Sequence, residues 1–467
     1  MSVHPAESEV WGSWYGTSEM REVFSDRAQL QDMLDVEAAL ARAQAKLGLV
    51  PPHVAEAITA AARVENMRLK RIAASARTVG YPVVGVVKEL GRAAGEEAAR
   101  YIHLGATTQD ILDTALVLQM RRACGFLRRD LLALARQLAE QAVRYRDTPM
   151  AGRTHLQQAV PITFGLKCAV WAAPLATHIE RLDAATRRTL VVEFGGAAGT
   201  LAPLAENGVA VLEALAQELD LGVPDLPWHV VRDGVAELVA LLGLICGSVA
   251  KFALDITLLT QTEVAEVFEP YITGRGGSST MPQKRNPIAS EYILAAVRGV
   301  HALVPLMLGA MVQDHERGTG PWQTEPLVIP QCFVLTAGAL AHACAIAEGM
   351  TVDGERMRQN LTATNGLIMA EAVVTALTPV IGRATAEEAL TQACNRVIAA
   401  GGSLREVLRA DPALRPHLSD AALKRLMDPA SYLGSAGAFV DRVVARVAAR
   451  SAVDIGAPRD TKGTETV

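Results

Sequence analysis

The feature that most constrains the fold is a set of long segments whose apolar residues recur with the period of an α-helix. The longest of them, residues 235–267, runs for more than thirty residues without a proline. With a rise of 1.5 Å per residue, a helix of that length spans about 50 Å. Helices of this order bury their apolar faces by packing side by side in bundles. The sequence therefore predicts an all-α fold built around long packed helices.

The rest of the chain supports this fold class. The same helical period recurs in residues 28–46, 129–145, 162–187, 209–219, 287–312 and 335–348. Alternating patterns typical of strands are nearly absent, and aromatic residues make up only 4% of a chain that is half hydrophobic. Breaks rich in proline and glycine predict four parts. They are an N-terminal helical domain (1–104), a central long-helix domain (105–350), a C-terminal helical domain (351–456) and a disordered tail (457–467).

Composition also excludes several classes of protein. The net charge is −5 and no basic stripe is visible, so we expect no nucleic-acid partner. The apolar run 238–259 contains Lys251 and Asp255, which favours a buried bundle helix over a membrane span. No secretory signal pattern opens the chain, so we predict a cytoplasmic protein. The six cysteines are widely spaced in apolar contexts, and we expect small buried residues, no metal site and no cofactor.

Residues 274–287, which read Gly-Arg-Gly-Gly-Ser-Ser-Thr-Met-Pro-Gln-Lys-Arg-Asn-Pro, carry the strongest chemical signal. Three glycines around Arg275 favour a loop, because glycine tolerates positive φ. Pro287 suits the first turn of a following helix. Hydroxyl, ammonium and carboxamide groups on one loop beside a helix N-terminus are suited to hold a dianion.

Two further segments have a similar character. Residues 103–110 (His-Leu-Gly-Ala-Thr-Thr-Gln-Asp) place small polar side chains before a helix that we expect to start near Ile111. Residues 152–165 place His155 in a polar turn before another helix. Capping of a helix explains part of each pattern without any catalysis.

Together the three segments resemble the signature motifs of the fumarase/aspartase superfamily, whose members eliminate a group from a substituted succinate to leave fumarate. The resemblance implies that Ser278 is the general base and that Lys284 and Asn286 bind a substrate carboxylate. It implies that His155 donates a proton or anchors the substrate. It also implies that His155 is held by Glu291, seven residues after the loop lysine.

The resemblance assigns substrate binding to further positions as well. These are Thr107, Thr108, Gln109, Thr154, Gln157, Arg317 and, with a weaker match, Arg21. Arg232 is another weak match, and it and Arg21 could equally form structural ion pairs. The family fold implies a homotetramer in which the central helices form one bundle and each active site is shared between subunits.

Whole-length likeness is greatest to bacterial 3-carboxy-cis,cis-muconate cycloisomerases, and nitrosuccinate lyases belong to the same branch. The cycloisomerases carry Trp at the position of His155 and a small residue at that of Glu291. We therefore expect a lyase that catalyses anti β-elimination from a small C2-substituted succinate, with nitrosuccinate as the best specific substrate. The cycloisomerase is the alternative.

Two other readings have less support. Adenylosuccinate lyases usually carry a His-Asp pair upstream of the first motif, whereas residues 78–84 contain no histidine. Some relatives of argininosuccinate lyase are structural crystallins with damaged sites. The joint presence of His155, Ser278, Lys284, Asn286 and Glu291 favours an enzyme instead.

Overall fold

The structure is a computed structural model that describes residues 4–277, 280–281 and 283–452. Within these residues nearly all regular structure is helical, and four short strands form two two-stranded sheets. The all-α prediction is confirmed. Ala, Leu and Val at helical spacing bury one face of each helix, and this outweighs any local preference for strands.

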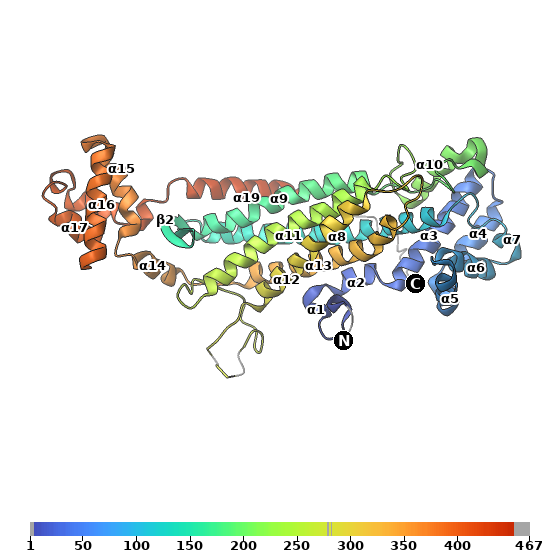
Figure 1. Ribbon diagram of the computed structural model, residues 1–467, viewed down its shortest axis with the longest axis horizontal. Helices are drawn as coiled ribbons and strands as arrows, with labels where there is room; N and C mark the ends of the chain where they lie inside the picture. The colour runs from blue at the N-terminus through green and yellow to red at the C-terminus, as the bar shows by residue number, and fades with distance from the viewer. Residues whose placement is uncertain (1–3, 278–279, 282, 453–467) are drawn as a thin grey trace, which may run out of the picture. The chain divides into compact units, whose positions relative to one another are not determined.

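Five long helices dominate the chain (Figure 1). They are α8 (Thr108–Arg144), α9 (Phe164–Thr189), α11 (Asp233–Thr260), α12 (Ile288–Ala310) and α13 (Pro321–Gly349). Helix α11 ends at Thr260, earlier than predicted, because residues 261–266 turn into a short strand. Helix α13 begins at Pro321, earlier than predicted, and keeps Pro326 and Pro330 inside it.

Contacts within the chain define two compact units, and their boundary falls inside the five long helices. The first unit comprises Met1–Leu131, Thr177–Gly247 and Tyr292–Ala341. Its other helices are α1 (Gly12–Tyr15), α2 (Ser18–Val23), α3 (Asp26–Lys46), α4 (Pro52–Ala61), α5 (Leu69–Val79), α6 (Val83–Ala94), α7 (Glu96–Ala99) and α10 (Gly208–Leu219). One apolar core joins α3 to α4, α6 and α10.

The second unit comprises Leu132–Ala176, Ser248–Glu291 and His342–Val467. It holds a hairpin of β1 (Pro149–Thr154) and β2 (Gln157–Thr163), and a second small sheet of β3 (Val267–Phe268) and β4 (Thr351–Val352). Its short helices are α14 (Gly354–Thr362), α15 (Ala370–Ile381), α16 (Arg383–Ala400), α17 (Leu404–Ala410), α18 (Asp420–Leu426) and α19 (Ala436–Ala452). A small apolar core joins α15, α16 and α17. The predicted division into four consecutive parts stays a prediction.

Three of the long helices, α11, α12 and α13, are long and apolar enough to cross a membrane by length and composition. In α11 the charges of the apolar run are paired, since Asp255 accepts bonds from Lys251 and from Trp171 Nε1, the latter at 2.7 Å. Apolar side chains on the other two helices are nonetheless exposed in the single chain: Leu306 by 48%, Leu308 by 47% and Leu327 by 61%. These faces resemble the packing surfaces of bundle helices that lack their partners.

The cysteines behave largely as predicted. Cys124, Cys168, Cys246 and Cys332 are buried, while Cys344 and Cys394 are half-buried, and none forms a disulfide. Burial raises the pKa of the Cys246 thiol to about 12, so it stays protonated.

Candidate functional site

The first motif lies where α8 begins, in the first unit. The Asp110 carboxylate accepts a bond from the Thr107 backbone N–H at 2.9 Å and so caps the helix. Arg317 reaches the same residue and donates to Thr107 Oγ1 at 3.1 Å and to the Ala197 carbonyl at 3.0 Å. The structure therefore brings two predicted binding residues, Thr107 and Arg317, into direct contact. Thr108 is half-buried in the first turn of α8.

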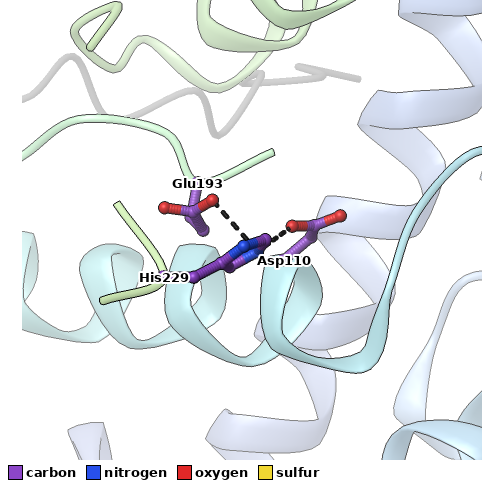
Figure 2. Close-up of side chains that lie close together, drawn as sticks. All are labelled: Asp110, Glu193 and His229. Carbon is purple, nitrogen blue, oxygen red and sulfur yellow. Dashed lines mark hydrogen bonds and ion pairs between the residues drawn. The ribbon is translucent and has the colours of Figure 1, made fainter. Parts of the chain in front are cut away.

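Asp110, the last residue of this motif, also belongs to a buried polar cluster with Glu193 and His229 (Figure 2). His229 Nε2 lies 2.7 Å from Asp110 Oδ1 and 3.2 Å from Glu193 Oε1. Asp110 also accepts bonds from the backbone N–H groups of Gly195, at 2.9 Å, and Gly196, at 3.0 Å. One carboxylate thus fixes both the helix start and the glycine loop that Arg317 contacts.

The cluster is electrostatically unusual because the acids outnumber the bases. Burial, together with the nearby charges of Asp113 and Asp110, raises the pKa of Glu193 to about 9. Glu193 is therefore neutral at pH 7, and its Oε2 accepts the Trp228 backbone N–H at 2.6 Å. Since Asp110 lies closer to His229 Nε2, the proton on that nitrogen is best placed toward Asp110.

The same three residues offer one carboxylate or imidazole atom each at distances that allow a shared metal ion. The geometry does not favour one. The 2.7 Å separation of His229 Nε2 and Asp110 Oδ1 is that of a hydrogen bond, and both Asp110 oxygens already accept backbone N–H bonds. Two atoms bound to one tetrahedral zinc at about 2.0–2.1 Å would lie farther apart than this.

Gln109 is fully buried in a second polar network. Its amide nitrogen donates to Asp113 Oδ2 at 3.0 Å and to the His229 carbonyl at 2.9 Å. Arg232 donates to Asp113 at 2.7 Å and to Glu325 at 2.8 Å. Arg232 thus forms the structural ion pairs that the sequence left open. In this chain Gln109 is held inside the core, and its contact with a substrate stays a prediction.

Arg21 has a comparable structural role. Its Nη1 donates to the carbonyls of Gly12, at 2.7 Å, and Gly16, at 3.0 Å, at the two ends of α1. A guanidinium that satisfies two backbone carbonyls fixes the N-terminal segment. The weaker sequence match at this position is consistent with such a role, and substrate binding by Arg21 stays a prediction.

The second motif forms the tip of the β1–β2 hairpin, where sequence patterns had predicted only a turn before a helix. Thr154, His155, Leu156 and Gln157 are all exposed, and Leu156 is exposed by 76%. His155 has φ 49° and Leu156 has φ 65°. Two successive left-handed residues are normally Asn or Gly in such a turn. A His-Leu pair there is strained, and strain of this kind concentrates at functional sites.

The third motif is the loop that precedes α12. Ser278 lies outside the described residues. Gly276 has φ +65°, and a Cβ there would lie 2.6 Å from the Asn286 carbonyl oxygen, so this position requires glycine. The Asn286 backbone N–H donates to the Gly276 carbonyl at 2.9 Å, and the Lys284 side chain is exposed. Glu291 is exposed in the first turn of α12.

The motifs are divided between the two units. Thr107, Thr108, Gln109 and Arg317 belong to the first unit. The residues that belong to the second unit are Thr154, His155, Gln157, Lys284, Asn286 and Glu291. Within the described part of this single chain, His155 and Glu291 share no hydrogen bond or ion pair. Their partnership stays a prediction.

Sequence reasoning missed Glu193 and His229 as site-supporting residues. Both are polar residues in otherwise apolar surroundings, next to the buried side chains of Val192 and Trp228. That local contrast is the signal that marks them. Their pairing with Asp110, however, spans 119 residues for His229, and no local pattern encodes such a contact.

Comparisons with known proteins agree with the motifs. A family model described as Lyase matches residues 15–301, and one described as Adenylosuccinate lyase C-terminus matches residues 366–443. The chain is 48% identical over 448 residues to 3-carboxy-cis,cis-muconate cycloisomerase of Pseudomonas aeruginosa, covering 95% of this chain and 97% of the relative. It is 44% identical over 431 residues to nitrosuccinate lyase of Streptomyces davaonensis, covering 90% and 91%.

A solved structure gives the same result. The 3-carboxy-cis,cis-muconate lactonizing enzyme of Pseudomonas putida superposes with a TM-score of 0.91 at 44% identity, covering 95% of this chain and 100% of that one. Family model, sequence relatives and fold therefore converge. The chain belongs to the lyase family of the fumarase/aspartase superfamily and is an enzyme.

Proposed function

We propose that the chain is a cycloisomerase that interconverts 3-carboxy-cis,cis-muconate and its lactone. The observation that carries the proposal is likeness over nearly the whole chain, at 48% identity, to a relative of that name. The sequence alone placed a substituted-succinate lyase first and this reaction second. The comparisons support the second better.

The proposed chemistry needs few groups. In the lactonising direction a substrate carboxylate oxygen adds to a C=C bond, and the π electrons move into a neighbouring carboxylate to form an aci-carboxylate dianion. Lys284, Asn286 and backbone N–H groups of the loop stabilise that dianion. Ser278 then delivers a proton to the α carbon, and in the reverse direction it removes that proton.

The first motif supplies the counterpart for another substrate carboxylate. Arg317 carries a permanent positive charge, and its bond to Thr107 Oγ1 holds a hydroxyl beside it. A guanidinium and a hydroxyl at a helix N-terminus are suited to a carboxylate ligand. A substrate with three carboxylates uses several such groups, which fits the number of polar residues in the motifs.

A second candidate function is elimination of nitrite from nitrosuccinate to give fumarate. It is favoured by His155 and Glu291, two of the positions at which the sequence departs from the cycloisomerase pattern. Here Ser278 removes the C3 proton, the same dianion forms, and the electrons of the C2–X bond leave with the group X. His155 steadies that leaving group. Likeness to a nitrosuccinate lyase at 44% identity supports this alternative.

We further propose a homotetramer with shared active sites in the cytoplasm. The exposed apolar faces of α12 and α13 support association through these helices. The division of the motifs between two units is consistent with sites completed by other copies of the chain. Small polycarboxylates are the proposed ligands, and no nucleic acid or membrane partner is proposed.

A substrate panel tests the proposal directly. Purified protein is incubated with 3-carboxy-cis,cis-muconate, nitrosuccinate, aspartate and adenylosuccinate, with Ser278→Ala as the matched inactive control. We expect loss of the muconate absorbance and formation of the lactone, and neither in the variant. Fumarate from nitrosuccinate without lactone formation would establish the second candidate instead. Turnover of adenylosuccinate alone would refute both.

A further inference from the structure

The hairpin that carries His155 has an irregularity just before its tip. Ala151 pairs with Pro161 and Arg153 pairs with Gln158, so the register shifts across Gly152. A Cβ on Gly152 would lie 2.7 Å from the Val160 carbonyl oxygen, so only glycine fits there. A bulge of this kind bends the strand and redirects the side chain that follows it.

The redirected side chain is Arg153, which forms a bidentate ion pair with Glu266. The guanidinium nitrogens lie 2.9 and 2.7 Å from the Glu266 carboxylate oxygens. Glu266 is completely buried, with 0% of its side chain exposed. A buried carboxylate is retained only when it is paired and hydrogen-bonded, so Arg153 is its essential counter-charge.

The other strand of the hairpin is tied to the same carboxylate through Asn360. The Asn360 amide nitrogen donates to Glu266 Oε1 at 2.7 Å and to the Val264 carbonyl at 2.8 Å. Gln158 in β2 donates to the Asn360 carbonyl at 3.0 Å. Both strands therefore attach to Glu266, one directly and one through a single residue.

Three residues further along the chain, a second carboxylate fastens α12. Glu269 accepts bonds from the backbone N–H groups of Ala289, at 3.1 Å, and Ser290, at 2.7 Å, and from the Ser290 hydroxyl at 2.7 Å. Glu291 is the next residue in that helical turn. The anchor segment, residues 266–269, thus holds both the hairpin with His155 and the helix start with Glu291.

We propose that Arg153 and Glu266 are positioning residues that hold His155 in its working orientation. The His155 tip is exposed and has left-handed backbone at two successive residues, so its own packing does not fix it. A strained tip keeps one conformation only when its surroundings over-determine it. The ion pair between Arg153, two residues before His155, and the buried Glu266 provides that constraint. The inference rests on the role of His155 in the second candidate function, the elimination of nitrite.

The test compares conservative variants of the buried pair with a matched control. Arg153→Lys keeps the charge but loses one of the two hydrogen bonds to the carboxylate, and Glu266→Gln keeps the shape but loses the charge. The control is Arg146→Lys, because Arg146 forms a similar bidentate ion pair with Asp441 in the same unit but on the surface. Its guanidinium nitrogens lie 2.9 and 2.8 Å from the Asp441 carboxylate oxygens.

With nitrosuccinate as the substrate, we expect both anchor variants to lower kcat about 10- to 100-fold with KM changed less than about threefold, because a misplaced group costs the transition state more than binding. The control should keep kcat within about twofold. Amide hydrogen exchange at residues 154–157 should speed up at least about tenfold in Arg153→Lys and not in the control. Unchanged kcat and unchanged exchange at the tip would overturn the inference, whatever the loss of thermal stability.

The exchange measurement also separates this inference from the proposed function. If the wild-type protein turns over none of the tested substrates but the tip loosens in Arg153→Lys, the function is wrong and the anchoring stands. If wild-type turnover is normal and the tip stays protected, the anchoring is wrong and the function stands. Should Arg153→Lys fail to fold, Asn360→Ser removes the amide that holds Glu266 and the Val264 carbonyl, and it is measured in the same way.

Discussion

Replacing Glu193 by Gln should stabilise the protein, by an amount that grows with pH. The side chain is fully buried, and its pKa rises from an ordinary 4.5 to about 9 through burial and the charges of Asp113 and Asp110. The folded state therefore keeps this proton up to about pH 9, whereas the unfolded chain loses it above about pH 4.5. Stability from this group is present below the unfolded pKa and is lost as pH rises toward the folded pKa.

The magnitude follows from the size of the shift. At pH 7 the pH lies about 2.5 units above the unfolded pKa, so ionisation of this carboxyl lowers the free energy of the unfolded state by about 3 kcal/mol, at 1.36 kcal/mol per unit. Glutamine has nearly the same shape and carries no charge at any pH, so it escapes this loss. Its carbonyl oxygen replaces Oε2 as the acceptor for the Trp228 N–H. The difference between variant and wild type should therefore increase by about 1.4 kcal/mol per pH unit between pH 5 and pH 8.

Urea unfolding at pH 5, 6, 7 and 8, at one fixed protein concentration, measures this difference. Glu206→Gln, at an exposed position of the same unit, is the matched control and should show no such trend. The slope with pH is the informative quantity, because any fixed cost of the new amide is the same at every pH. A difference that is flat with pH, or one that favours the wild type more at pH 8 than at pH 5, would refute the assignment of a neutral Glu193.

Four further outcomes are expected. Ser278→Ala should lower kcat by about 10² or more while the oligomer stays intact on size-exclusion chromatography, and wild-type turnover would exclude Ser278 as the base. His155→Ala should lower kcat strongly for nitrosuccinate and little for 3-carboxymuconate. Glu291→Gln should have a weaker effect in the same direction. Equal effects on both substrates would show that His155 does not distinguish the two candidate reactions. Glu269→Ala should cost about 1 kcal/mol by uncapping α12, seen as a lower urea midpoint. Burial and the charge of Arg181 lower the pKa of His178 to about 4. The folded state therefore keeps His178 neutral while the unfolded chain takes up a proton, and the protein loses stability as pH falls from about 6.5 toward 4. Replacing His178 by Gln should lessen this loss of stability in acid.

Helical periodicity was a reliable guide to the fold because it is a local property. Residues 28–46 and 209–219 correspond closely to α3 and α10. The start of α13 was missed, and the part of the helix that lay outside the prediction contains Pro326 and Pro330, which the helix tolerates. The β1–β2 hairpin was missed, and because β2 ends directly at α9, its last two residues, Ile162 and Thr163, were included in the predicted helix 162–187.

The candidate site was predictable only in part, for a related reason. The resemblance to the superfamily motifs identified Thr107, His155 and Lys284 as candidates, and it could be seen because each lies in a local pattern of polar residues and glycine. The contact of Arg317 with Thr107 spans 210 residues, and that of Arg153 with Glu266 spans 113. Such pairings depend on how distant segments pack, and a single sequence carries no local record of that packing.

The same limit applies to the choice of substrate. His155 and Glu291 suggested a leaving group that needs assistance, whereas the whole-chain comparisons favour lactonisation. Function follows the groups that meet the substrate, and a superfamily fold hosts several related eliminations. The positions of individual side chains around the substrate, rather than the fold, therefore decide between the two reactions.

In the proposed homotetramer, the three motifs act as one site, completed by different copies of the chain around Ser278. Mixing Ser278→Ala chains with Arg317→Ala chains, under conditions in which subunits exchange, tests this, because the proposed roles of Ser278 and Arg317 are needed in both candidate reactions. We expect the two impaired proteins to regain a measurable fraction of wild-type activity, because some sites in a mixed oligomer then contain both intact residues. Mixed oligomers that demonstrably form and stay inactive would contradict it.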